Sequence, residues 1–212
     1  MKHFLILLLL SVGLIGCTDL KPATNIFAPT PTNAPTHPHD TLQDDYEVYT
    51  TILPALFGSS PVFVIEQNTF AKAGDLTLPN GELQALLPET LSDFISQNSQ
   101  SYPLKMIFSR DDKIFILADR ADFYEKPSPE NGLSCTGMRV KCFNASKFKA
   151  AYPEASGITL LSKIGYSSDR TQALVTAEQD NGQDSGVIYI LLLQKESGQW
   201  KIEDTYELFW II

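Results

Sequence analysis

Carboxylates are the side chains best placed to do acid–base chemistry in this chain. Glu178, Glu203 and Glu207 fall in segments that read as neighbouring strands, where their side chains would point to one side of a sheet. Two carboxylates about 5–9 Å apart can act as acid and base on a glycosidic bond. Glu203 and Glu207 also fit the polar face of a strand, where solvated charge is ordinary. We therefore assign no catalytic residue from the sequence.

The remaining carboxylates indicate turns and surface. Residues 178–184 place oxygen ligands around a glycine, which Ca²⁺ would accept, but their spacing matches no calcium loop. Asn181-Gly182 is instead typical of a hairpin turn. Four more acids flank a predicted hairpin and read as surface residues: Asp111, Asp112, Asp119 and Asp122. We expect neither a metal site nor a cofactor site.

The positions of the histidines exclude much of hydrolase chemistry. His3, His37 and His39 are the only histidines. The rest of the chain thus has no histidine to activate a serine or cysteine nucleophile, to bind zinc or to relay a proton. Residues 37–40 (His-Pro-His-Asp) could capture a transition metal, although a solvated linker is the simpler interpretation. There is no glycine-rich phosphate loop or nucleophile elbow either.

The start of the chain has the layout of a secretory signal. Lys2 and His3 precede an apolar run from Phe4 to Gly13, which leads into Leu14-Ile15-Gly16-Cys17. These four residues resemble the lipobox of bacterial lipoproteins. The resemblance implies that residues 1–16 are a signal peptide, that the Cys17 thiol carries a diacylglyceryl group and that the new amine is acylated.

Two alternatives to the lipoprotein interpretation remain. The first alternative is a plain secretory signal with an ordinary cleavage site, which has the same layout. The second is that the apolar run is a buried segment of the domain core. A membrane-spanning helix is disfavoured because it needs about 20 apolar residues. The lipobox implies a location in the bacterial cell envelope, outside the cytoplasm and held to the membrane by lipid. Thr18 after the cysteine favours the outer membrane by the enterobacterial sorting pattern.

The other two cysteines form a candidate disulfide. With Cys17 lipidated, Cys135 and Cys142 remain as a pair in an oxidising compartment, where a bridge would close a short loop. Such a bridge contributes about 2.5 kcal/mol in the chain-entropy model. A redox or metal-binding thiol pair is the alternative, but the spacing is wider than in redox motifs and no histidine lies nearby.

Composition divides the mature chain into a tether and one domain. Residues 17–40 begin with the lipidated cysteine and are rich in proline and threonine, which favours a spacer of up to about 70 Å rather than a packed core. Residues 41–212 have the size of a single domain. Loss of Lys2 with the signal lowers the formal net charge from −9 to about −10. This balance argues against nucleic acid and against electrostatic docking on anionic lipid.

Hydrophobic periodicity predicts helices early in the domain. Thr41 begins a helix with an apolar face up to Leu53, and Pro54 and Gly58 should end or kink it. A second helix follows Pro88, and a third runs from Ala145 to Tyr152. Residues 61–67 read as a strand, and residues 104–109 and 113–118 as a hairpin.

The last third predicts a four-stranded meander with strands at 158–166, 172–178, 187–194 and 200–212. Residues 187–193 are apolar throughout, so this strand should be central, whereas the last strand alternates and should have one core face. The expected class is α+β, with helices packed on an antiparallel sheet.

The C-terminal part resembles known proteins in two ways. Its tyrosine strand, Gly-x-Trp-x-Ile turn and closing strand are similar to the strand pairs of nuclear-transport-factor-2-like cone folds. It is also similar to uncharacterised bacterial exported proteins with a Tyr-Pro-x-x-Ser-Gly-Ile stretch followed by Thr-Gln-Ala-Leu-Val. Those residues here are Tyr152-Pro153, Ser156-Gly157-Ile158 and Thr171 to Val175. The resemblance implies an architecture and carries no catalytic residue.

Two functions follow as hypotheses. The first is a noncatalytic, membrane-anchored envelope lipoprotein whose domain binds an envelope protein or a small ligand. The second is a carboxylate-dependent enzyme, for example a glycoside hydrolase acting on envelope or extracellular carbohydrate. An enzyme needs a pocket with convergent polar groups, whereas an interaction module needs an exposed apolar patch or a sheet edge.

Overall fold

The computed structural model describes residues 43–58, 60–71, 83–105, 112–126, 142–181 and 185–211, with only the backbone of residues 185 and 209–211. These residues belong to one compact unit. The elements in chain order are α1 (Gln43–Phe57), β1 (Val62–Glu66), α2 (Pro88–Gln97), β2 (Ile114–Ala118), the 3₁₀ helix η2 (Arg120–Phe123), β3 (Tyr124–Glu125), β4 (Cys142–Phe143), α3 (Ala145–Ala151), β5 (Ala155–Leu161), β6 (Gly165–Tyr166), β7 (Gln172–Asp180), β8 (Ser185–Glu196) and β9 (Gln199–Ile211).

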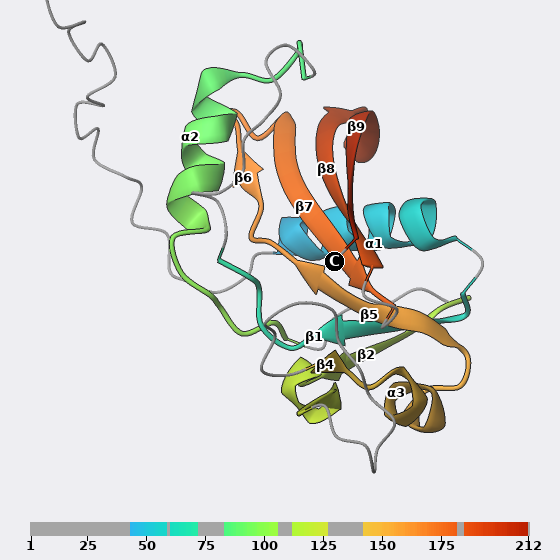
Figure 1. Cartoon of the computed structure of the whole chain (residues 1–212). Helices are drawn as coiled ribbons and strands as arrows, with labels where there is room; N and C mark the ends of the chain where they lie inside the picture. Colours follow the sequence, from blue (N-terminus) through green and yellow to red (C-terminus); the bar gives the residue numbers. More distant parts are fainter. Residues whose placement is uncertain are drawn as a thin grey trace, which may run out of the picture. The chain divides into compact units, whose positions relative to one another are not determined.

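Within these residues the strands form a mixed seven-stranded sheet of order β2-β1-β5-β7-β8-β9, with β6 paired to β7, and a small β3–β4 sheet (Figure 1). The α+β class is therefore confirmed. The last four long strands, β5, β7, β8 and β9, form the expected antiparallel meander. Residues 187–193, predicted to be covered on both faces, lie in β8: residues 190–193 are fully buried, whereas residues 187–189 are only partly buried.

The expectation of a purely antiparallel sheet is wrong, because β1 runs parallel to both of its neighbours, β2 and β5. Parallel strands need long crossovers, and the chain between β1 and β2 includes α2. The sequence carried a signal, the unbroken apolar run of residues 62–65, which is typical of a parallel strand covered on both faces. The structure buries all five residues of β1. The predicted hairpin paired residues 113–118 with residues 104–109, but β2 (Ile114–Ala118) pairs with β1 instead. Residues 106–111 lie outside the described part of the chain.

Three apolar clusters form the core. Alternate residues of β7 face opposite sides of the sheet, so Ala173, Val175 and Ala177 pack against α1, while Leu174 packs with Phe94 of α2. A third cluster joins α3 and η2 to β1 and β5 through aromatic side chains such as Phe123 and Phe148. The helices thus cover both faces of the sheet.

α1 is a helix because apolar side chains recur on the face that it buries. Tyr46, Val48, Tyr49, Ile52 and Leu53 are buried, and two acids stand in its first turn, where they favour the positive end of the helix dipole. Pro54 does not end the helix, which continues to Phe57. The other two helices are found where they were predicted, α2 directly at Pro88 and α3 ending one residue before Tyr152.

Two β-bulges change the sheet where the sequence predicted regular strands. The predicted strand 158–166 is divided into β5 and β6, because one extra residue separates the pairs Leu161–Ala177 and Gly165–Leu174. In β9 the register shifts by one residue at Glu203. As a result Trp200 and Ile202 join the core under α1, while Tyr206 and Leu208 join the core under α2. A one-residue shift turns a strand's side chains to the other face.

Candidate functional site

The bulge between β5 and β6 is built by Ser162. Its N–H donates to the Thr176 carbonyl over 3.0 Å, but the Thr176 N–H is bound by the Ser162 hydroxyl over 2.9 Å instead of by a backbone carbonyl. The Ser162 carbonyl is thereby freed, and it accepts the hydroxyl of Tyr49 from α1 at 2.7 Å. Bulges commonly redirect a neighbouring side chain, and here that side chain belongs to Lys163.

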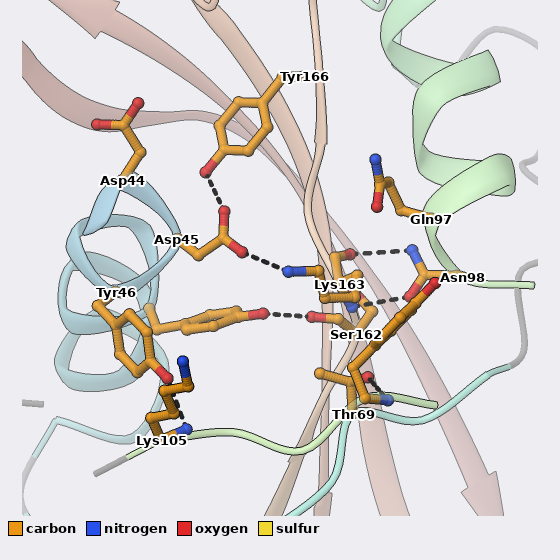
Figure 2. Close-up of polar contacts among 12 residues, drawn as sticks. Asp44, Asp45, Tyr46, Thr69, Gln97, Asn98, Lys105, Ser162, Lys163 and Tyr166 are labelled. Atoms are coloured by element: carbon orange, nitrogen blue, oxygen red, sulfur yellow. Dashed lines mark hydrogen bonds and ion pairs between the residues drawn. The ribbon is translucent and has the colours of Figure 1, made fainter. Parts of the chain in front are cut away.

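A buried charge network lies beside this bulge. The Lys163 ammonium is 2.7 Å from the Asp45 carboxylate, whose other oxygen accepts the Tyr166 hydroxyl at 2.9 Å. Figure 2 shows Asp45 between these two donors, reaching from α1 to the strand. Lys163 and Asp45 are 7% and 2% exposed. A buried pair of this kind depends on hydrogen bonds to both charges. Asp45 accepts from Lys163 and Tyr166, and the Lys163 ammonium donates to Asp45 and lies 5.9 Å from the Tyr102 ring centroid.

Asn98, at the C-cap of α2, holds the backbone of the same lysine. Its Oδ1 accepts the Lys163 N–H at 2.7 Å, and its Nδ2 donates to the Lys163 carbonyl at 3.0 Å and to the Phe94 carbonyl at 2.8 Å. Figure 2 shows this amide beside the Lys163 backbone. The Asn98 amide thus provides the hydrogen bonds that a neighbouring strand would otherwise form with the Lys163 backbone, and it connects α2 to the sheet.

The tyrosines of the network act as permanent donors. Burial raises the pKa of Tyr166, and the charge of Asp45 and its hydrogen bond to the hydroxyl raise it further. The pKa of Tyr49 is raised by burial first and then by the Asp45 charge. Protons held this firmly do not exchange with a substrate near neutral pH. The network joins α1, α2 and the sheet, and we assign it a structural role.

A pocket of about 290 Å³ opens on the opposite side of β5, at the C-terminal end of β1. It combines two carboxylates, one guanidinium, an amide and two hydroxyls with a small apolar wall. The lining residues are Glu66, Asn68, Thr69, Phe70, Ala71, Ser101, Arg120, Leu160 and Glu178. Polar groups that converge in a hollow are what a binding site requires.

The two carboxylates of the pocket stand on strands that flank β5. Leu160 pairs with Glu178 on β7, and the β1–β5 register continued by one residue places Glu66 beside Leu160 on its other side. Two strand spacings, about 10 Å, therefore separate the backbones of the two acids. Glu66 is 7% exposed, and its Oε2 accepts the backbone N–H of Arg120 at 2.6 Å.

Arg120 brings positive charge to this acidic pocket. Its guanidinium lies 5.3 Å from the ring centroid of Tyr124, and it forms no ion pair with any side chain in the described part of the chain. The Tyr124 hydroxyl donates to Asp180. Burial, followed by this hydrogen bond, raises the pKa of Tyr124, while the charge of Arg120 opposes the rise.

The segment after β1 forms the polar wall. The Thr69 N–H donates to the Tyr102 carbonyl at 2.8 Å, the Tyr102 N–H donates to the Thr69 hydroxyl at 2.9 Å, and the Ser101 hydroxyl donates to the Thr69 carbonyl. These contacts hold Asn68 at the pocket. Its side-chain amide forms no hydrogen bond to the described residues, so a donor and an acceptor remain available there.

The structure does not bring Glu178, Glu203 and Glu207 together. Glu178 lines the pocket, whereas Glu203 and Glu207 are exposed on β9. Glu178 of β7 pairs with Ile188 of β8, which pairs with Leu208 of β9, so these three side chains lie on one face of the sheet. Glu207 lies in the same way on the face of Ala177, the residue before Glu178. Successive residues of a strand point to opposite faces, so Glu178 and Glu207 lie on opposite sides of the sheet.

Other predicted positions have structural roles or lie outside the described residues. Asp119 caps η2 by accepting the Ala121 N–H at 2.8 Å, and Asp112 and Asp122 are exposed. Among the described residues no three metal-binding side chains lie close enough to hold an ion. Cys142 is buried on β4. Outside the described residues lie Cys17, His37, His39, Asp111, Cys135 and residues 182–184.

Sequence reasoning missed Glu66, Arg120 and Asn68. Glu66 ends a buried apolar strand, and a charged residue at such a place is a signal that could have been used. No local sequence pattern marks Arg120 or Asn68 as a site residue, because their neighbours in the pocket come from distant parts of the chain.

Comparison with known proteins gives no further constraint. No protein-family model, curated protein or solved structure matches the chain. No helix in the described ranges is both long and apolar enough to span a membrane. Inference about function must therefore start from the residues themselves.

Proposed function

We propose that this chain is a lipid-anchored protein of the bacterial cell envelope whose domain binds a small polar ligand without transforming it. The pocket beside Leu160 carries the binding part of this proposal, because it gathers charged and neutral polar groups around an apolar wall. The lipobox resemblance at Cys17 supports the anchor, with the outer membrane favoured by Thr18. The domain would stand outside the cytoplasm on the tether of residues 17–40.

The pair Cys135–Cys142 belongs to the same proposal. An oxidising compartment favours a disulfide, and Cys142 is buried on β4 next to Phe143, whose ring packs on η2 and α3. The bridge would fasten this small sheet near the pocket residue Arg120.

Mass spectrometry of the full chain, extracted in detergent from its own membranes, tests the anchor and the binding together. Under denaturing conditions we expect a chain that starts at Cys17, carries acyl chains and contains no free thiol. Under native conditions we expect an additional noncovalent ligand. A chain starting at Met1, or an unacylated start, would contradict the anchor.

A matched pair of variants ties the retained ligand to the pocket. Ala71 and Ala150 are both exposed alanines, but only Ala71 lines the pocket. Ala71→Trp should fill the pocket mouth and lose the ligand, whereas Ala150→Trp on α3 should retain it. Equal retention by both variants, or no ligand in the unmodified protein, would count against the proposed binding.

Carboxylate-dependent glycoside hydrolysis is the second candidate, and it is favoured by one observation. Glu66 and Glu178 line the same pocket from two strands that flank β5. If they act as acid and base, Glu178→Gln should abolish the release of reducing ends from envelope carbohydrate, while Glu207→Gln should not. The absence of release by the unmodified protein would eliminate this candidate.

A further inference from the structure

Arg120 is a charged group with an unused binding capacity. Arg120 is an exposed residue that lines the pocket, and its guanidinium carries five N–H donors in a fork that suits a carboxylate. The guanidinium lies over the face of Tyr124, and within the described residues no acid pairs with it. An anionic group entering the pocket would therefore find a cation that no carboxylate of the described residues neutralises.

Glu66 offers the complementary charge from the floor of the same pocket. Glu66 is 7% exposed, and its Oε2 accepts the backbone N–H of Arg120. Oε1 accepts no hydrogen bond from the described residues. A buried carboxylate with an unused oxygen favours a ligand that brings a charged donor.

The neighbouring walls limit the rest of the ligand. Phe70 and Leu160 form an apolar surface, and Asn68 adds one amide donor and one amide acceptor. About 290 Å³ is at the small end for ligand pockets. The space therefore suits a compact molecule with a short apolar part.

We propose that the pocket takes a small zwitterion of the α-amino-acid type, with its carboxylate on Arg120, its ammonium on Glu66 and its apolar side chain against Leu160 and Phe70. This inference rests on the proposed ligand-binding function. A simple anion would meet two carboxylates, and a simple cation would meet the guanidinium. A neutral sugar would leave the guanidinium and the two carboxylates without a counter-charge, whereas a ligand with both signs gives Arg120 and Glu66 each an opposite charge.

Calorimetric titration of the full chain in detergent tests the ligand class. The probes are L-leucine and D-leucine, N-acetyl-leucine, which lacks the ammonium, leucinamide, which lacks the carboxylate, and N-acetylglucosamine as a neutral sugar. At least one leucine enantiomer should bind at least tenfold more tightly than either blocked analogue, because each analogue loses one charged hydrogen-bond group.

Variants of two residues, Arg120 and Glu66, assign the ends of the ligand. Arg120→Gln should weaken leucine at least tenfold and leave leucinamide unchanged, and Arg120→Lys should restore part of the affinity. Glu66→Gln should weaken leucine similarly and leave N-acetyl-leucine unchanged. The glutamine oxygen can still accept the Arg120 N–H, which preserves the fold. If Glu66→Gln nevertheless fails to fold, the Arg120 variants alone decide, with Lys201→Gln on β9 as an exposed, distant control.

The outcomes separate this inference from the proposed function. If N-acetylglucosamine binds, Ala71→Trp blocks it and neither leucine binds, the zwitterion is wrong but ligand binding stands. If the blocked analogues bind as tightly as leucine, the charge assignment is wrong. If no probe binds, the zwitterion is wrong, and the ligand retained in native mass spectrometry still decides the proposed function.

Discussion

A single lysine in an apolar stretch organises the contact between α1 and the sheet. Lys163 stands between Ser162 and Ile164, and its charge is compatible with burial only because Asp45 reaches it from a helix more than a hundred residues earlier in the chain. Removing either charge would leave the other buried and unpaired, which typically costs about 3–5 kcal/mol. A lysine in an apolar stretch predicts that an acidic residue pairs with it, but the sequence does not predict that this residue is Asp45.

Tyr166 should make the protein sensitive to alkaline conditions. Its pKa in the folded state is raised by burial and by Asp45 above the ordinary value of about 10, so folding favours the protonated form. The resulting stabilisation is complete below pH of about 10. It decreases at higher pH by up to about 1.4 kcal/mol per pH unit until the folded-state pKa is reached. Tyr166→Phe removes this contribution.

Urea unfolding at several values between about pH 9 and 11 measures the effect. The free energy of unfolding should fall less steeply with pH in Tyr166→Phe than in the unmodified protein. At pH 8 the variant should be less stable by about 1–3 kcal/mol, because Asp45 loses a buried donor. Parallel slopes for both proteins would show that the Tyr166 proton is not linked to folding.

At the scale of elements, α2 is fixed to the sheet along its whole length. The Gln172 side chain accepts the Leu87 N–H before its start, Asp93 accepts the Tyr166 N–H at its middle, and Asn98 binds Lys163 at its end. Its backbone also comes very close to β6, where a Cβ at Gly165 would lie 2.3 Å from the Phe94 nitrogen. Only glycine permits this approach.

Gly165→Ala should therefore destabilise the protein by about 1–3 kcal/mol or more, because α2 must move away from the sheet. Gly58→Ala is a matched control, since its Cβ would meet only the Pro54 carbonyl oxygen, at 3.1 Å. Thermal unfolding followed by circular dichroism measures both. Equal melting temperatures would mean that the contact between α2 and β6 adapts without cost.

The same scale shows what local sequence patterns can and cannot predict. The periodicity of residues 88–97 and 145–151 was sufficient for α2 and α3, because a helix closes its hydrogen bonds locally. The alternation from Trp200 to Leu208 predicted one core face for the last strand, and this prediction is wrong, because the Glu203 bulge turns the two halves of β9 to opposite faces. A bulge depends on the partner strand, so β9 alone does not reveal it.

At the scale of the whole molecule, the class of the fold was predictable and the pocket was not. Helices followed by the meander gave the α+β class and the position of β8 between two neighbouring strands, β7 and β9. The pocket forms only because β1 inserts between β2 and β5, which brings Glu66 and Glu178 to either side of Leu160. Parallel pairing joins distant segments, and no local pattern encodes the choice of neighbour.

The place of β1 between β2 and β5 also determines when the domain can become complete during synthesis. Its two neighbours, β2 and β5, follow it by many residues, and the core around α1 waits for Trp200 near the end of the chain. A nascent chain that lacks its last strands has an unfinished interior and cannot yet close around its first helix. Such a chain cannot bury its interior until nearly all of it has been synthesised.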